Sequence, residues 1–153
     1  MKTLSTKLTA AVDSAEAALL TVTEEQSAKP VLTGGWSRKQ LIGHLIDSAG
    51  NNHQRFVRAA LQDSVTLPGY DQAGWSRAQF VQDAPWSMLI ALWATYNRYL
   101  AHVIAHLPDE KLDVPICIGS YEPMTLRFVA EDYLVHLNHH LAQIGIATSV
   151  PES

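Results

Sequence analysis

The sequence is short of several features that mark common classes of protein. Its single cysteine, Cys117, cannot form a disulfide within the chain, which is typical of proteins in a reducing compartment. Lysine and arginine are neither in excess nor clustered, and the formal net charge is −4, so nucleic acid is not an expected partner. No segment is apolar for long enough to cross a bilayer, and residues 1–20 lack the uninterrupted apolar run of a signal peptide. We therefore expect a soluble, cytoplasmic protein without a membrane partner.

What the sequence does contain is typical of one globular domain. Hydrophobic residues make up 47% of the 153 positions and charged residues 17%, which is enough apolar material to bury a core. The chain has no internal repeat and no low-complexity tract. We expect residues 1–153 to form a single domain.

Apolar residues recur at helical spacing in four segments, and strand patterns are few. The segments cover about residues 4–22, 37–61, 85–107 and 125–144. Ser37 and Gln40 have the spacing of a capping box at the start of the second segment. Asp83 is placed to cap the third segment, and Pro108 stops it. These signals predict four long amphipathic helices.

Four such helices predict an all-α fold, a four-helix bundle. The first connection is short, whereas the second and third are long. The third connection holds three prolines and fits a short hairpin around Gly119. Two long connections argue against simple up-down-up-down wiring.

The last segment is unusually rich in imidazole, with three of the seven histidines inside EDYLVHLNHHLAQIG, residues 131–145. His136 and His140 are four residues apart, so on a helix their side chains point in nearly the same direction. Both lie on the flank of the apolar stripe, whereas His139 turns further toward solvent. Two imidazoles at this spacing can share a metal ion, but they do not complete its coordination shell. The alternative interpretation is a polar helix face with solvated histidines.

A third ligand has to come from another helix. His44 lies on the flank of the second segment, and His53, in the polar stretch NNHQR, is the weaker candidate. His102 and His106 repeat the four-residue spacing in the third segment, so spacing alone does not choose between the two pairs. The pair that begins at His136 also lacks the glutamate of the His-Glu-x-x-His zinc-protease helix.

Three stretches carry motifs that occur together and in order over about residues 30–145. GGWSRKQLIGHLIDSAGNNHQRF contains a Trp-Ser opening, a histidine seven or eight residues on, an Asp-Ser pair and a later Arg-Phe. PGYDQAGW contains a Tyr-Asp pair and a tryptophan, and YLVHLNHHLAQI contains the histidines four residues apart. Together they resemble the DinB-like/YfiT-like family of metalloenzymes. That family includes mycothiol-dependent isomerases, and it also includes thiol S-transferases that use bacillithiol.

The resemblance implies a ligand set of His44, His136 and His140. It implies that His139 is not a ligand and that the two histidines of the third segment take no part. It also implies that residues 1–153 form one DinB-like bundle with up-down-down-up wiring, and that such chains are frequently homodimers.

The chemistry of such a site follows from the number of ligands. Three neutral imidazoles leave an open position on a divalent ion, as in catalytic zinc sites. Zinc and nickel are the expected metals, and iron or manganese are further candidates. An ion with an open position acidifies a bound water or activates a thiolate.

Residues that follow His44 on the second segment are candidates for a substrate pocket. They are Asn51 and Arg55, the latter suited to an anionic substrate, although a surface ion pair explains it equally well. Tyr70 and Trp75, in the long second connection, are candidates to cover the pocket, and packing of the loop onto the bundle is their alternative explanation.

Metal-ligating histidines usually donate their second N–H to an oxygen acceptor. Asp47, Asn51 and Asp132 are the candidates for this role, and a solvated helix face accounts for each of them as well. Cys117, in VPICIG, is expected to be a small buried apolar residue, not a nucleophile.

We therefore predict a metal-dependent enzyme that acts on a small-molecule substrate. The expected reaction is transfer of a low-molecular-weight thiol to an electrophile, or hydrolysis at the same site, with no catalytic acid or base assigned. The alternative is a non-catalytic stress-response bundle that binds a metal or a small molecule without turnover.

Overall fold

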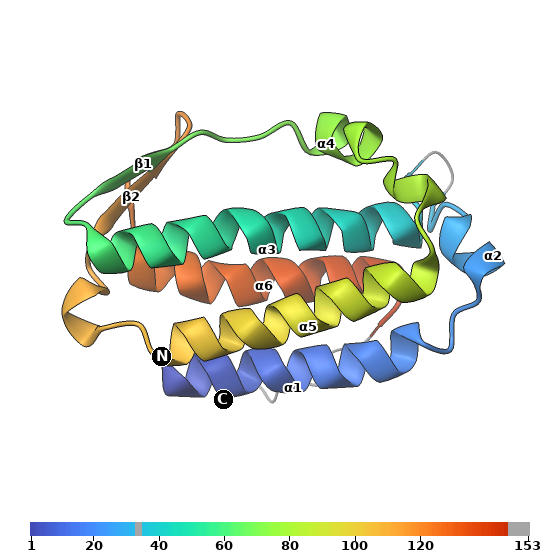
Figure 1. Cartoon of the computed structure of the whole chain (residues 1–153), viewed down its shortest axis with the longest axis horizontal. Coiled ribbons are helices and arrows are strands. Elements are labelled where there is room, and N and C mark those ends of the chain that lie inside the picture. Colours follow the sequence, from blue (N-terminus) through green and yellow to red (C-terminus); the bar gives the residue numbers. More distant parts are fainter. Residues whose placement is uncertain (33–34, 147–153) are drawn as a thin grey trace.

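Four long helices form the body of the protein (Figure 1). The computed structural model describes residues 1–32 and 35–146. The long helices are α1 (Lys2–Leu19), α3 (Arg38–Leu61), α5 (Trp86–Ala105) and α6 (Leu126–Ile144). The shorter helices are α2 (Glu24–Ala28), α4 (Gln72–Ala78), and the 3-10 turns η1 (Val81–Asp83) and η2 (Asp109–Lys111). A small sheet contains β1 (Val65–Leu67), β2 (Pro115–Ile118) and β3 (Met124–Thr125).

The wiring of the bundle is up-down-down-up (Figure 1). Helices α1 and α6 run in one direction, and α3 and α5 run in the other. Helix α1 packs on α5, and α3 packs on both α5 and α6. The predicted four-helix bundle with long second and third connections is therefore confirmed. The antiparallel contact between α3 and α6 brings together the two helices that carry His44, His136 and His140.

Local sequence signals start and end the two helices of the site. The Ser37 hydroxyl accepts a hydrogen bond from the Gln40 backbone N–H (3.2 Å), and the Gln40 side chain accepts one from the Ser37 N–H (2.9 Å), which is the predicted capping box. The Thr125 hydroxyl caps α6 by accepting from the Phe128 N–H (3.1 Å). Gly145 ends α6 with a φ of 91°, a conformation that favours glycine.

Two helix boundaries differ from the prediction. Helix α1 ends at Leu19, and the following turn forms the separate helix α2. Asp83 does not cap α5, because Ala84 is extended and separates it from the helix. The first free N–H of α5, on Trp86, instead donates to the Glu24 carboxylate of α2 (2.8 Å). The cap thus comes from a residue distant in sequence, which periodicity does not reveal.

The small sheet ties the two long connections together. Strand β1 pairs in parallel with β2, and β2 pairs antiparallel with β3. The predicted hairpin around Gly119, which has a φ of 55°, is confirmed. The parallel strand β1 was not predicted, because three residues are too few to show an alternating pattern. From β1 the chain runs along α3 toward α4 (Figure 1). This segment includes Tyr70, whose hydroxyl lies 3.4 Å from His44 Nδ1.

The interior of the bundle is mainly apolar, although Asn97 of α5 is buried there and accepts a hydrogen bond from the Tyr133 hydroxyl. The largest fully buried side chains include Trp93, Phe56, Leu45 and Ile104. Besides Lys39 in its first turn, α3 buries a stripe of polar residues on adjacent turns: His44, Asp47, Ser48 and Asn52. Buried polar groups need partners, so this stripe is where chemistry is expected. Among the described residues, no helix combines the length and hydropathy of a membrane span.

Candidate metal centre

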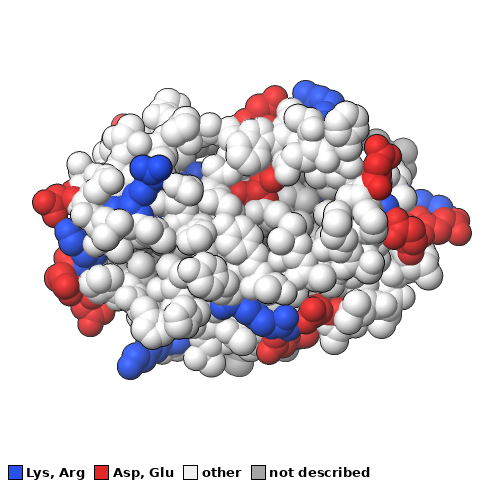
Figure 2. Space-filling view, viewed as in Figure 1, with Lys and Arg blue, Asp and Glu red and all other residues white. Residues whose placement is uncertain are grey.

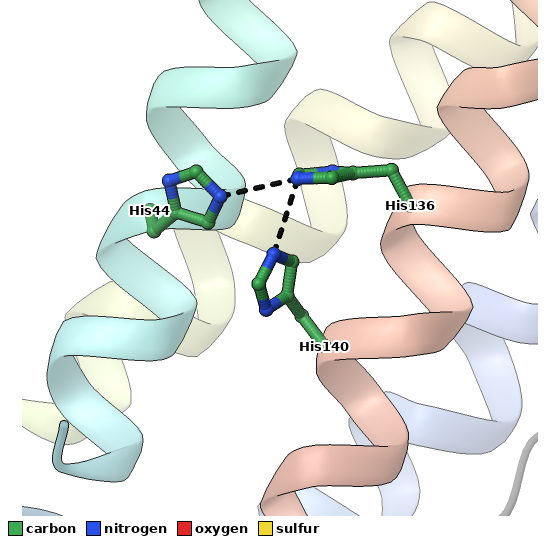
Figure 3. A group of neighbouring side chains, drawn as sticks. All are labelled: His44, His136 and His140. Carbon is green, nitrogen blue, oxygen red and sulfur yellow. Dashed lines mark hydrogen bonds between the residues drawn. The ribbon is translucent and has the colours of Figure 1, made fainter. Parts of the chain in front are cut away.

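Three histidine side chains converge between α3 and α6 (Figure 3). His44 comes from α3, and His136 and His140 come from successive turns of α6. The Nε2 atom of His136 lies 3.2 Å from Nε2 of His44 and 3.1 Å from Nε2 of His140. One nitrogen from each ring lies within 4.8 Å of the other two. The structure therefore brings together the three residues that the family resemblance implies as ligands.

This arrangement of nitrogens suits a shared cation. A neutral ring nitrogen carries either one lone pair or one N–H, so His136 Nε2 can form a hydrogen bond with only one of its two neighbours. For metal–nitrogen bonds of about 2.05 Å, nitrogens are roughly 3.3 Å apart in a tetrahedral shell and roughly 2.9 Å apart in an octahedral one. The observed separations of 3.2 and 3.1 Å lie between these values. The donor set fits a divalent ion and does not select among zinc, nickel, iron and manganese.

The second nitrogen of each ring meets a side-chain oxygen. Nδ1 of His140 lies 2.9 Å from the Gln143 carbonyl oxygen, whose amide nitrogen in turn contacts His139. Nδ1 of His136 lies 3.4 Å from the Ser48 hydroxyl, and Nδ1 of His44 lies 3.4 Å from the Tyr70 hydroxyl. A proton held on Nδ1 leaves the Nε2 lone pair free for a metal. The three rings are thus oriented as ligands by neutral partners.

The predicted partners of the ligands were wrong. The Asp47 carboxylate accepts hydrogen bonds from the Gln79 amide (2.9 and 3.1 Å), and the Asn51 amide donates to the Asp47 backbone carbonyl (2.9 Å). Asp132 is exposed and forms no hydrogen bond to a histidine within the described chain. Ser48 and Gln143 were missed. Gln143 lies three residues after His140, a spacing that puts the two side chains in contact, whereas Ser48 meets His136 only because α3 packs on α6.

Burial keeps the three imidazoles neutral. Burial, with smaller contributions from the neighbouring histidines, lowers the pKa of His44 to about 4. Burial likewise lowers the pKa of His136 to about 4, and it lowers the pKa of His140. Metal binding requires deprotonated histidines. At neutral pH these rings are therefore already in the neutral form that binds a metal.

A pocket of about 340 Å³ opens beside the cluster. His44 and His136 line it together with Asn51 and Arg55, so the two predicted pocket residues do face this space. Tyr70 also lines the pocket and packs against Trp75, with ring centroids 4.8 Å apart. Burial and the nearby Asp47 raise the pKa of Tyr70 to about 12, so its hydroxyl stays protonated at neutral pH.

The remaining histidines lie outside the cluster. His102 and His106 are exposed, and His106 Nδ1 hydrogen-bonds to the backbone carbonyl of His102 (2.8 Å). His139 is exposed, and His53 Nδ1 lies 2.9 Å from the Tyr96 hydroxyl. Burial thus distinguishes the two histidine pairs that share a four-residue spacing.

Cys117 is only half-buried, so the prediction that it is a buried apolar residue was wrong.

The sequence profile of the DinB superfamily matches residues 7–144 of this chain. The chain belongs to the DinB superfamily. Among curated proteins of similar sequence, one from Oceanobacillus iheyensis is 29% identical over 126 residues, which is 82% of this chain and 72% of the relative. Another, from Bacillus subtilis, is 28% identical over 129 residues, which is 80% of this chain and 70% of the relative. It is named "Putative metal-dependent hydrolase YfiT", and the first relative is likewise named a metal-dependent hydrolase.

The present chain shares its fold with a solved structure. The structure of YfiT from Bacillus subtilis superposes with a TM-score of 0.85 at 24% sequence identity, covering 94% of this chain and 82% of YfiT. That structure is described as having an unusual four-helix bundle topology. The present chain likewise forms a four-helix bundle, with up-down-down-up wiring.

Proposed function

We propose that this DinB protein is a metal-dependent enzyme in which His44, His136 and His140 hold one divalent ion beside a substrate pocket. The observation that carries the proposal is the convergence of three imidazoles beside a 340 Å³ pocket, which two of them, His44 and His136, line. A structural metal site is normally closed by four protein ligands, whereas three ligands beside a pocket are typical of catalysis. A non-catalytic metal-binding bundle would have no need for the pocket.

The reaction that we propose first is transfer of a low-molecular-weight thiol to an electrophile. A divalent ion at this place would supply Lewis acidity, which favours the thiolate or hydroxide form of a nucleophile. The Tyr70 hydroxyl, 3.4 Å from His44, is a protonated donor at the pocket wall that can hydrogen-bond to a developing negative charge.

Hydrolysis of a small substrate is the second candidate, because relatives of this chain carry names that describe metal-dependent hydrolases. Both reactions place a nucleophile at the same wall of the pocket. They differ in whether water or a thiol attacks. Asp132, which lines the pocket and is exposed, is the carboxylate available there to accept a proton from water.

Metal analysis and turnover test the proposal together. Protein purified without chelators should hold about one divalent ion per chain. Loaded with zinc or nickel, it should consume a thiol and an electrophile from a panel, or hydrolyse small esters and amides. Retained metal without any turnover would favour the non-catalytic bundle. Metal content that is unchanged in all three of the alanine variants at His44, His136 and His140 would refute the site itself.

The predicted homodimer is proposed on a separate surface. The outer face of α3 and α5 exposes large apolar side chains, among them Val57, Met88, Leu92 and Tyr99. Figure 2 shows mostly uncharged side chains over the middle of this face. A two-fold dimer buries the same patch on both chains, which an uncharged patch permits. Light scattering after size exclusion should give twice the chain mass, and Leu92→Glu should give the monomer mass.

A further inference from the structure

Arg55 carries a positive charge into the pocket, and no carboxylate of the described residues lies within ion-pair distance of it. It is half-buried and lines the pocket, and it takes part in none of the ion pairs formed among residues 1–32 and 35–146. The contact that it makes is a hydrogen bond from Nη1 to the Asn52 side-chain oxygen (3.2 Å). Burial lowers the pKa of Arg55, yet a guanidinium remains charged in proteins. Asp132 acts on Arg55 from beyond ion-pair distance, and burying part of a charge without a directly paired carboxylate costs stability, which is typical of a binding group.

The side chain of Arg55 turns toward the histidines. Arg55 follows His44 by 11 residues, which is three helical turns, so both project from the same face of α3 about 16 Å apart along the axis. Helical side chains lean toward the N-terminus of their helix. The bond to Asn52, one turn nearer to His44, shows that Arg55 follows this rule. The guanidinium thus borders the same pocket as His44 and His136.

The charges of the pocket suit a monoanion. Arg55 is the single lysine or arginine among the residues that line it, and Asp132 and Asp47 contribute nearby negative charge. A phosphate dianion would meet one positive charge and the repulsion of Asp132. A carboxylate matches both the charge and the planar fork of a guanidinium, which binds it through two parallel hydrogen bonds.

We propose that Arg55 binds a carboxylate group of the substrate or of its thiol partner, while the reacting atom of that molecule lies at the histidine cluster. Only the placement of the reacting atom at the histidine cluster rests on the proposed function. The role of Arg55 in binding a carboxylate can be tested on the protein without metal. The substrate class is therefore a small carboxylate with a reactive group at a set distance from it.

Binding to the metal-free protein tests Arg55 by itself. The probes are 3-phenylpropionate and 3-phenylpropanamide, which have nearly the same shape and differ in charge, with phenyl phosphate as a dianion. Calorimetry in the presence of a chelator should show the carboxylate binding about tenfold or more tightly than the amide. Arg55→Gln should remove that difference, and Arg55→Lys should reduce it because the fork is lost. Equal binding of carboxylate and amide, or tighter binding of the phosphate, would overturn the proposal.

A matched control lies one turn further along α3. Arg58 is exposed and donates to Gln54 (3.0 Å) outside the pocket, so Arg58→Gln should leave the preference for the carboxylate unchanged. A loss in both variants would mean that the net charge of the protein, and not Arg55, attracts the anion. Melting curves of each variant establish that it is folded.

A series of thiols tests the distance between the two ends of the site. Mercaptoacetate, 3-mercaptopropionate, 4-mercaptobutyrate and 6-mercaptohexanoate are added to nickel-loaded protein, and binding is followed by the thiolate-to-nickel absorption band. Affinity should peak at one chain length in the wild type and lose that peak in Arg55→Gln. Affinity that rises steadily with length, or tighter binding of cysteamine, would overturn the proposal. Absence of nickel binding with intact carboxylate binding would reject the metal enzyme and leave the role of Arg55 in place.

Discussion

His139 and His140 are neighbours in sequence with opposite environments. His140 faces the cluster, with its Nε2 atom 3.1 Å from His136 Nε2, whereas His139 is exposed. We expect His140→Ala to lower the metal content well below one ion per chain, because two imidazoles hold an ion far less tightly than three. His139→Ala should leave the metal content unchanged. Elemental analysis of the two dialysed variants decides between them, and equal losses would contradict the ligand assignment.

The pair His102 and His106 extends the same comparison to α5. Both side chains are exposed, although their spacing equals that of the two proposed ligands on α6. The double substitution of both residues by alanine should therefore leave one ion per chain. Loss of metal from that variant, with its helical circular dichroism intact, would mean that surface histidines supply the ion-binding site.

Gln143 holds His140 in the orientation of a ligand. Its side-chain oxygen lies 2.9 Å from His140 Nδ1, so Gln143→Leu removes the acceptor that keeps the proton on that nitrogen. Removing such a partner typically weakens metal affinity by about tenfold to a hundredfold. A competition titration with a chromogenic chelator measures the change. The His139→Ala variant removes the other contact of Gln143 and is expected to keep wild-type affinity.

At the scale of single elements, α3 contains two glycines in contrasting surroundings. A Cβ built on Gly43 would lie 2.4 Å from Val81 Cγ1, because the backbone of α3 packs closely on η1. A Cβ on Gly50 would meet only the Tyr96 hydroxyl, at 4.0 Å. Close approach of α3 to η1 therefore requires glycine at position 43 but not at position 50.

Alanine substitutions at these two positions should change stability in opposite directions. Gly50→Ala should raise the free energy of unfolding by about 0.5–1 kcal/mol, because alanine loses less conformational entropy in a helix. Gly43→Ala should lower it by about 1–2 kcal/mol, since the overpacking against Val81 exceeds that gain. Urea denaturation of both variants measures these changes. Stabilisation by Gly43→Ala would show that η1 shifts freely away from α3.

At the scale of the whole molecule, the buried histidines make stability depend on pH. The pKa of His44 and of His136 is about 4 in the folded protein, and histidine in an unfolded chain titrates near pH ~6.5. Between these values the unfolded chain binds protons that the folded chain does not, so stability falls as pH falls from ~6.5 toward ~4. The lowered pKa of His44 alone corresponds to a loss of about 3 kcal/mol in the free energy of unfolding over that range.

Urea denaturation in a chelator, at pH 7.5 and at pH 5, tests this expectation. The metal-free protein should lose stability between the two values, and His44→Gln should lose less. The double alanine variant of His102 and His106 should keep the wild-type loss, because those side chains are exposed. A metal-free protein equally stable at both pH values would show that the histidines accept protons in the folded state.

Added metal should stabilise the folded chain and lose this effect in acid. An ion that binds only the folded state raises the melting temperature, and protons compete with it for the same nitrogens. The gain in melting temperature on adding zinc or nickel should be large at pH 7.5 and should shrink as the pH falls through the range in which imidazole titrates.

The described residues form one core cluster, so a single cooperative unfolding transition is expected. Two separate transitions would contradict the prediction that the chain is one domain.

The sequence by itself determined the helices of the site and the pairing of His136 with His140 on one helix face. Ser37 with Gln40 starts α3, Thr125 and Gly145 bound α6, and the four-residue spacing of His136 and His140 puts both rings on one face. These features are local, because a helix repeats every 3.6 residues and its caps depend on adjacent residues. The link from this pair to His44 came from a family resemblance, since periodicity left the pair on α5 as an equal choice.

Tertiary structure alone decided which histidine pair is buried and what surrounds it. Packing of α3 against α6 places His44 at the rings of α6, while the outer face of α5 leaves His102 and His106 exposed. The parallel strand β1 and the passage of Tyr70 over His44 depend on contacts between residues far apart in the chain. Such contacts leave no periodic signal in the sequence, because each side chain finds its partner only after the helices have packed.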